Sequence, residues 1–344
     1  MMKKDSGFIG IMVANRNERK YALKKYLDFN TTNMKIFCFT PSEIDWERKS
    51  ITGIHCLNRK WLQNKFSFPE VIYNRCYRIN NRMIERLKAN IGSNKWFNHI
   101  NQFNKHEIHK NLSQWLVQYL PETVLYDKEY TSHLLDIHKV LYFKPCYGNK
   151  GKGVYRVELK DSGEIHIGDH HFVPRIIVGD SLQFQEEIHK LVGSIPYIIQ
   201  KGVDIQKLHN RIFDIRVLAQ KNKKGLWSVT NVVSRIAHKG CFNTSMCKKV
   251  CLSEEVLNRL YPPNEVNAII QSIYDISLRA AEIMEMSTSY HLGELSVDFA
   301  LDNNGFFWII EVNGKPQKDL YDELNKRSRV YKRPLEYAQY LSEN

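Results

Sequence analysis

The chain has 344 residues, of which 43% are hydrophobic and 12% aromatic. This composition is ordinary for a globular protein and excludes wholesale disorder, and the length predicts two or three domains. Lys and Arg outnumber Asp and Glu by 50 to 37, which gives a formal net charge of +13. This excess favours an anionic partner: a nucleotide, an acidic substrate, a nucleic acid or an anionic surface. Nucleic acid ranks last, because Trp and Tyr are not gathered into a basic stripe.

The seven cysteines are odd in number and form no Cys-x-x-Cys pair. This pattern argues against a disulfide framework and against a zinc site, and it indicates a reducing compartment. No apolar stretch approaches the length needed to cross a bilayer, so we expect a cytoplasmic protein without a membrane partner. The oligomeric state is open.

The amino-terminal part has the pattern of a small α/β domain over residues 1–90. Apolar runs at 7–14, 35–39 and 71–73 predict buried strands, and residues 18–27 have the period of a surface helix. Strand, helix and strand at this spacing indicate a parallel sheet.

The rest of the chain changes from helices to strands. Residues 81–118 are polar and favour connecting helices, and the strand at 141–143 leads into a glycine-rich turn. A helix with apolar residues three and four positions apart is expected at 266–286. Further strands are expected at 153–159, 164–167, 197–200, 214–220, 227–234, 296–301 and 306–312. The fold class is therefore α/β and α+β.

Residues 143–154, with the sequence FKPCYGNKGKGV, form a basic glycine-rich segment. Gly148, Gly151 and Gly153 allow the backbone to approach a bulky anion closely, and Lys144 adds positive charge at the strand end. The spacing is that of neither a Walker A motif nor a dinucleotide fingerprint. A lid over a triphosphate is one interpretation, and a plain hairpin turn is the other.

Two acids and an amide are expected to meet on the closing hairpin. The turn at 302–305 pairs the two last strands, which brings Asp298 close to Glu311 and Asn313. Glu311 and Asn313 share a strand face. Three such oxygen ligands suit Mg²⁺ that also holds phosphate oxygens. The alternative is a strand-end acid in a salt bridge, although an unpaired charge in so apolar a strand is costly.

Arginines gather on the strands between residues 211 and 235. Arg211, Arg216 and Arg235 accompany Asp214, and arginine is suited to a bidentate hold on phosphate or carboxylate. An ordinary strand ion pair is the alternative. Asp204 can accept hydrogen bonds from ribose hydroxyls, or it is a solvated loop acid.

In their order and spacing, these segments resemble the ATP-grasp enzymes, and in particular the YheC/YheD-type family associated with the endospore coat of spore-forming bacteria. The resemblance covers roughly residues 95 to 330. It rests on four segments: 200–203 (QKGV), 213–217 (FDIRV), 227–230 (WSVT) and 311–316 (EVNGKP).

The resemblance implies two α+β lobes that clasp ATP, preceded by a small Rossmann-like domain. Its domains would be an amino-terminal pre-ATP-grasp domain at 1–90, a central lobe with the glycine-rich lid at 91–205 and a carboxy-terminal lobe with the metal site at 206–335. Residues 336–344 would be a tail.

The resemblance also assigns roles to residues. Lys105 and Lys144 would hold the α- and β-phosphates of ATP, and Arg216 and Arg235 would face the γ-phosphate and the acyl substrate, with Lys144 also catalytic. The lid would be formed by Gly148, Gly151 and Gly153. Adenine would be contacted by the backbone of Gln200, Lys201 and Gly202, and ribose by Asp204. One or two Mg²⁺ would be bound by Asp298, Glu311 and Asn313.

The activity that the resemblance implies is an ADP-forming ligase. Such enzymes phosphorylate a carboxylate to an acyl phosphate, which an amine or a similar nucleophile attacks, so positioning and charge neutralisation dominate the catalysis. The substrates are open, and spore coat components are implied partners. The alternative is a non-catalytic ATP-binding scaffold or sensor at the spore coat. The sequence departs from its relatives where Cys247 and Lys248 replace expected glycines, which affects the acceptor side.

Overall fold

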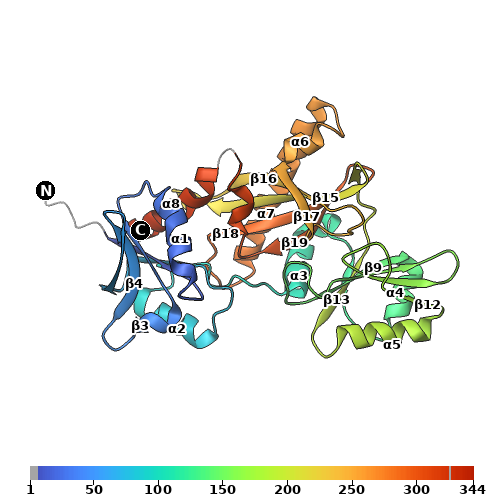
Figure 1. Cartoon of the computed structure of the whole chain (residues 1–344), viewed down its shortest axis with the longest axis horizontal. Helices are drawn as coiled ribbons and strands as arrows, with labels where there is room; N and C mark the ends of the chain where they lie inside the picture. The colour runs from blue at the N-terminus through green and yellow to red at the C-terminus, as the bar shows by residue number, and fades with distance from the viewer. Residues whose placement is uncertain (1–6, 325–326) are drawn as a thin grey trace.

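The structure is a computed structural model that describes residues 7–324 and 327–344. Three separate sheets divide the chain into an amino-terminal domain, a central lobe and a carboxy-terminal lobe (Figure 1). The amino-terminal domain and the central lobe lie at opposite ends of the molecule, with the carboxy-terminal lobe between them. The mixed α/β and α+β class expected from the sequence is confirmed.

The amino-terminal domain has a mainly parallel centre with an antiparallel edge. Its strands follow the order β3-β4-β2-β1-β6-β7, with β5 paired to β4. The strands are β1 (Phe8–Met12), β2 (Lys35–Phe39), β3 (Ile44–Asp45), β4 (Ser50–Leu57), β5 (Lys60–Ser67), β6 (Val71–Asn74) and β7 (Trp96–Phe97). The helices are α1 (Glu18–Leu27), η1 (Pro41–Glu43) and α2 (Asn81–Ile91). The expected elements at 18–27 and 35–39 are found at those bounds, whereas the β4–β5 hairpin was not predicted.

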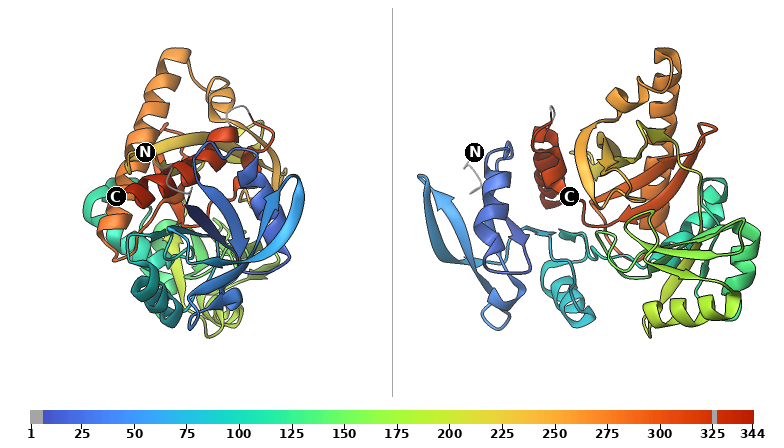
Figure 2. Two further views of the ribbon diagram at one scale, coloured as in Figure 1. Left: turned by 90° about the vertical axis from the view of Figure 1, so that its left-hand side faces the viewer. Right: turned by 45° about the vertical axis from the view of Figure 1, so that its right-hand side comes forward.

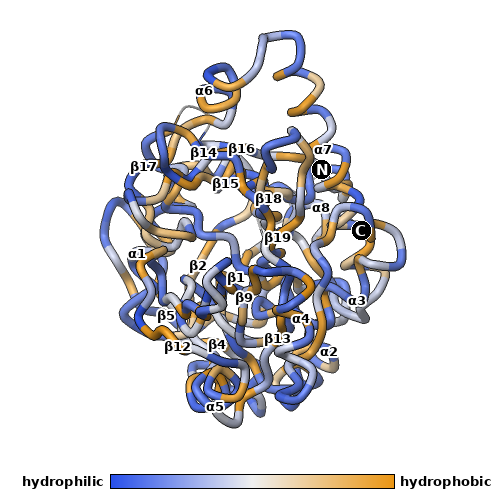
Figure 3. The backbone as a smooth tube through the Cα atoms, turned by 90° about the vertical axis from the view of Figure 1, so that its right-hand side faces the viewer, coloured by the Kyte–Doolittle hydropathy of each residue, from blue (hydrophilic) through white to orange (hydrophobic). Residues whose placement is uncertain are grey.

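The central lobe is an antiparallel sheet whose core includes side chains of two helices. The order is β12-β11-β10-β9-β13-β8, and α4 and α5 share one hydrophobic cluster with the sheet. The strands are β8 (Thr123–Leu125), β9 (Val140–Pro145), β10 (Tyr155–Leu159), β11 (Ile165–Asp169), β12 (Ile176–Val178) and β13 (Tyr197–Lys201). The helices are α4 (Thr131–His138) and α5 (Ser181–Val192). Figure 3 shows α5 alternating between hydrophobic and hydrophilic residues, as a helix with one buried face requires.

The carboxy-terminal lobe contains the long strands that carry most of the charged residues of interest. Its order is β17-β16-β15-β18-β19, with β14 paired to β15. The strands are β14 (Lys207–Leu208), β15 (Arg211–Lys221), β16 (Trp227–Ala237), β17 (Cys247–Leu252), β18 (Glu294–Leu301) and β19 (Phe307–Asn313). The helices are α3 (Lys105–Leu116), η2 (Val117–Tyr119), α6 (Ser253–Leu257) and α7 (Pro263–Met286). The expected helix at 266–286 is the greater part of α7, and α3 packs into the core of this lobe, although the sequence placed it in the central lobe.

The last helix returns to the amino-terminal domain. Segment η3 (Lys318–Tyr321) follows β19, and α8 (Arg327–Glu343) then lies between the amino-terminal domain and the carboxy-terminal lobe (Figure 2). The side chains of Leu335, Tyr337 and Leu341 are buried there. Residues 336–343 are therefore the packed second half of α8. The expected tail at 336–344 is wrong, because the apolar face of these residues completes a core.

A buried polar network joins the same two domains. Glu294 at the start of β18 is 1% exposed, and it accepts hydrogen bonds from Tyr73 Oη at 2.6 Å and Arg75 Nη1 at 2.8 Å. Lys318 Nζ lies 2.7 Å from the other Glu294 oxygen, and Gln220 Nε2 donates to that oxygen at 2.9 Å. Tyr73 and Arg75 come from the amino-terminal domain, so this carboxylate fixes the domain against the carboxy-terminal lobe.

Among the residues that the structure describes, no helix combines the length and the hydropathy that a bilayer-spanning segment needs.

Candidate active site

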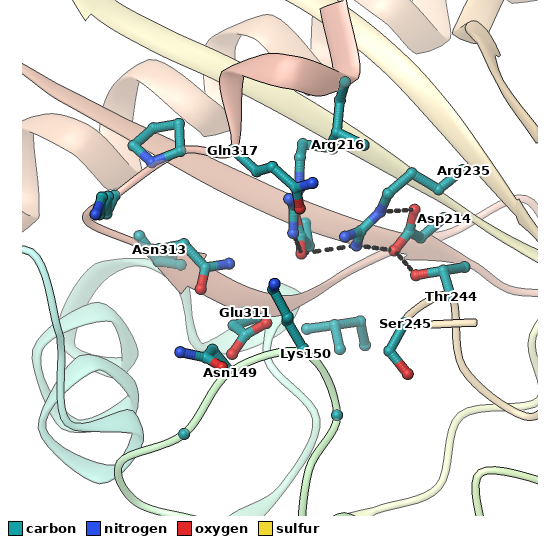
Figure 4. A pocket seen from close by; sticks show the side chains of 18 of the residues that line it. Asn149, Lys150, Asp214, Arg216, Arg235, Thr244, Ser245, Glu311, Asn313 and Gln317 are labelled. Atoms are coloured by element: carbon teal, nitrogen blue, oxygen red, sulfur yellow. Dashed lines mark hydrogen bonds and ion pairs between the residues drawn. The ribbon is translucent and has the colours of Figure 1, made fainter. Parts of the chain in front are cut away.

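A cavity of about 830 Å³ opens where the three parts of the molecule meet. Its walls come from the β9–β10 loop and β13 of the central lobe, from strands β15, β18 and β19, and from the strand ends of the amino-terminal domain. Figure 4 shows side chains of the β9–β10 loop, of β15, β16 and β19 and of the β16–β17 connection turned toward one another around a shared space. Such a volume is in the range of small-molecule sites.

Lys144 is a buried cation with a neutral neighbour. It lies on β9 opposite Ile198 of β13, and its Nζ donates to Gln200 Oε1 at 2.6 Å. Gln200 Nε2 in turn donates to Thr123 Oγ1 at 3.0 Å, which fixes the amide so that its oxygen faces the lysine. Burial lowers the pKa of Lys144 to about 8, against the attraction of Glu311. A lysine held this way is prepared to receive an anion that restores its charge.

Lys105 connects the glycine-rich loop to the closing hairpin. It begins α3, which Asn104 caps by accepting hydrogen bonds from two backbone amides. The Lys105 ammonium lies 3.1 Å from Glu311 Oε1 and donates to the carbonyl oxygen of Gly148 at 3.3 Å. One cation therefore contacts both a strand-end acid and the loop.

The glycine-rich loop has the backbone that only glycine adopts readily. Gly151 and Gly153 have φ of +69° and +72°. A Cβ on Gly151 would lie 2.6 Å from the Ser245 hydroxyl oxygen, so the loop packs closely against the β16–β17 connection. Lys150, at the tip of the loop, points into the cavity (Figure 4). Gly148 and Gly151 line the cavity, whereas Gly153 is not among its lining residues.

The arginines form a fixed ion-pair network on neighbouring strands. Arg216 on β15 faces Asp298 on β18 and donates to both of its carboxylate oxygens, at 2.7 and 2.6 Å. Arg235 Nη2 reaches Asp298 at 2.9 Å and also pairs with Asp214, to which Thr244 donates as well. Although burial opposes it, the two guanidinium groups keep the pKa of Asp298 below its usual range. The network holds two cations at one edge of the cavity.

The expected meeting of two acids and an amide on the closing hairpin is present. Asp298 pairs with Glu311 across β18 and β19, and Ser296 pairs with Asn313. The Asn313 Nδ2 atom is buried and lacks a hydrogen-bond partner among the described residues. The described chain contains no cluster of three or more His, Cys, Asp or Glu able to hold a metal. The donor set nevertheless fits Mg²⁺, which needs only one or two carboxylates when phosphate oxygens and water complete its shell.

Two expected contacts lie outside this cavity. Asp204 and Gly202 line a separate depression of about 260 Å³, where Asn303 Nδ2 donates to Asp204 Oδ2 at 2.7 Å. The amide of Gly202 donates to the carbonyl of Val140 at 2.8 Å and is not free for a base. The ribose contact through Asp204 stays a prediction, although its neighbours Val203 and Ile205 line the cavity and Asp204 itself does not. Lys201 does line the cavity.

Other lining residues were not found from the sequence. Tyr142, Ile212, Ala300 and Ile310 come from strands of both lobes and form an apolar part of the wall. The alternation of side chains along a strand could have indicated which face of the sheet each residue lies on. It could not have shown that the two sheets lie close enough for these faces to share one cavity. Asn243 and Cys247, from the region where the sequence departs from its relatives, also line the cavity.

Comparison with known proteins agrees with this architecture. Residues 93–341 match the YheC/D-like ATP-grasp family. The chain belongs to this family. It is 29% identical to the endospore coat-associated protein YheD of Bacillus subtilis strain 168 over 325 residues, which cover 89% of this chain and 70% of YheD. It is 22% identical to YheC of the same organism, over 97% of this chain and 95% of YheC.

Solved structures show the same fold for this YheC/D-like chain. D-alanyl-alanine synthetase A from Vibrio cholerae O1 biovar eltor strain N16961 superposes with a TM-score of 0.59 at 12% identity, covering 99% of this chain and 100% of that one. N5-carboxyaminoimidazole synthetase from Staphylococcus aureus gives 0.53 at 12% identity, over 97% and 78%. The expected ATP-grasp fold is therefore confirmed.

Proposed function

We propose that this YheC/D-like protein is an ADP-forming ligase that uses ATP and Mg²⁺ to join a carboxylate to an amine or a similar nucleophile. One observation carries the proposal. Lysines of the central lobe and of α3, arginines of the carboxy-terminal lobe and the oxygen ligands of its closing hairpin all face one cavity between the lobes. Clustered cations beside a Mg²⁺-type donor set match the charge of a nucleoside triphosphate.

The nucleotide would lie with its base against the apolar wall and its phosphates among the cations. Tyr142 of β9 and Ile310 of β19 both line the cavity, and such side chains suit a flat aromatic ring. Lys144 and Lys105 would hold the α- and β-phosphates under the glycine-rich loop. Glu311 and Asn313, with Asp298, would hold Mg²⁺, which when bound neutralises phosphate charge.

The proposed reaction has two steps that balance without a protein nucleophile. A substrate carboxylate oxygen attacks the γ-phosphorus and ADP leaves; an amine then attacks the acyl carbon, phosphate leaves and the amine gives up a proton. Arg216 and Arg235 are positioned to neutralise the transferred phosphoryl group, and their pairing with Asp298 holds the guanidinium planes in place before substrate arrives.

Calorimetry with a non-hydrolysable ATP analogue, with and without Mg²⁺, tests the nucleotide half of this proposal. We expect Mg²⁺-dependent binding in the wild-type protein and its loss in Glu311→Ala. ADP release in a screen of carboxylates paired with amines tests the ligase half. Folded protein that takes up no nucleotide would refute both halves.

A nucleotide-binding scaffold or sensor is the second candidate. It is favoured by the names of YheD and YheC, which give a place, the endospore coat, and no reaction. A location at the spore coat is part of both candidates. Nucleotide binding without substrate-dependent ADP release, together with coat assembly that survives Lys144→Met, would favour the scaffold.

A further inference from the structure

The end of the cavity next to the amino-terminal domain carries charges that the nucleotide proposal does not use. In parallel α/β sheets, ligands bind beyond the carboxyl ends of the strands. Here the segments after β1 and β6 supply Glu18, Arg75 and Tyr77 to the cavity wall, and the segment after β19 supplies Lys315. Three segments far apart in the sequence thus form one subsite.

Most charged groups at this end are paired with one another. Arg75 and Lys318 both pair with the single carboxylate of Glu294. Lys315 makes no ion pair within the described parts of the chain, and its Nζ lies 5.9 Å from the centre of the Tyr77 ring. Glu18 also lines the cavity. Its Oε1 accepts a hydrogen bond from the side chain of Asn15.

The position of Lys315 relates it to the reacting groups. It follows Asn313 by two residues, so its Cα lies within about 7 Å of the proposed Mg²⁺ ligand. A half-buried ammonium without a carboxylate partner is costly unless a ligand supplies one.

We propose that Lys315 binds a carboxylate of the acceptor, so that the acceptor of this ligase is an amino acid whose amine faces the acyl phosphate. This proposal rests on the proposed function. The carboxylate lies against Lys315 and Tyr77, while Glu18 stands beside the path of the incoming ammonium. Formation of the amide releases phosphate and a proton and leaves the acceptor carboxylate unchanged.

Calorimetry on protein loaded with a non-hydrolysable ATP analogue and Mg²⁺ tests the proposal. The probes are the common amino acids, each compared with its carboxamide, which has the same shape without the negative charge. We expect at least one amino acid to bind at least tenfold more tightly than its carboxamide. Lys315→Met should remove that preference and Lys315→Arg should keep it, while Lys223→Met, in an exposed turn, should have no effect.

The outcomes separate this proposal from the one it rests on. If the ATP analogue binds but no amino acid does, or if carboxamides bind equally well, the acceptor assignment is overturned and the nucleotide site stands. If Lys315→Met weakens the ATP analogue instead of the amino acid, Lys315 is a phosphate contact. Equal unfolding midpoints for Lys315→Met and the wild type ensure that a loss of binding is not a loss of folding.

Discussion

The buried carboxylate of Glu294 should contribute more to stability than any exposed charge in the chain. In Glu294→Gln the side chain keeps its shape but loses its negative charge. Arg75 and Lys318 then face a neutral amide. One of the two cations also faces the amide NH₂ group, which is a hydrogen-bond donor and cannot accept its hydrogen. Removing one partner from a buried ion pair costs about 3–5 kcal/mol, because the remaining charge stays desolvated.

The pKa of the Glu294 carboxyl gives a similar value for its contribution to the free energy of unfolding. Burial alone would raise its pKa, but Lys318 and Arg75 outweigh burial and lower the pKa of Glu294 from 4.5 to about 2. A lowered pKa contributes stability above pH 4.5 that is lost as the pH falls toward 2. At 1.36 kcal/mol per pH unit, this contribution is about 3 kcal/mol.

Urea unfolding at pH 7, followed by tryptophan fluorescence, measures the effect. We expect the free energy of unfolding of the first transition to fall by about 3 kcal/mol or more in Glu294→Gln, and to lose the part of its dependence on pH between 4.5 and 2 that Glu294 supplies. Glu265→Gln, on the exposed first turn of α7, is the matched control and should change little. A loss below about 1 kcal/mol would refute the view that this network holds the domain in place.

Three further predictions concern the nucleotide. Lys144→Met should raise the Kd for the Mg²⁺–ATP analogue by about ten- to a hundredfold, as expected for the loss of a charged hydrogen bond. Above pH 8, binding of the analogue to the wild-type protein should be accompanied by uptake of a proton by Lys144. Calorimetry in buffers of different ionisation enthalpy measures this uptake. Glu311→Gln should abolish the Mg²⁺ dependence of binding, measured against EDTA. Gly151→Ala should weaken binding, because its Cβ meets Ser245, whereas Gly163→Ala, with φ +88° and open space, should leave the Kd unchanged.

The spacing of hydrophobic residues predicted the helices and strands whose buried residues are also the hydrophobic ones in the local sequence. Residues 18–27 and 35–39 have the expected bounds: α1 buries Leu23 and Tyr26, three positions apart, and β2 is an apolar run with four of its five residues buried. Strand β5 was missed because seven of its eight residues are not buried, so its sequence shows no alternation. The helix at 336–343 was missed because the surface that buries Leu341 is supplied by a domain some three hundred residues earlier.

The sequence predicted the part of the candidate site that lies on the closing hairpin. Counting residues through a tight turn placed Asp298 opposite Glu311, and the register confirms that placement. That Arg216 and Arg235 share Asp298 depends on β15 lying between β16 and β18, which no local pattern specifies. The hydrogen bond from Asn303 to Asp204 joins residues 99 apart in the sequence, so it could not be predicted for the same reason.

A single short segment relates the parts of the proposed mechanism to one another. Glu311, Asn313, Lys315 and Lys318 follow one another from β19 into η3, and in the proposed mechanism the first two would hold the metal and Lys315 would contact the acceptor. Because Lys318 donates to Tyr26 and Tyr73 of the amino-terminal domain and pairs with Glu294 of β18, this segment cannot shift against that domain without breaking buried polar contacts. The distance between the phosphate end and the acceptor end of the cavity is therefore set by the chain itself, which is what in-line transfer between two bound substrates requires.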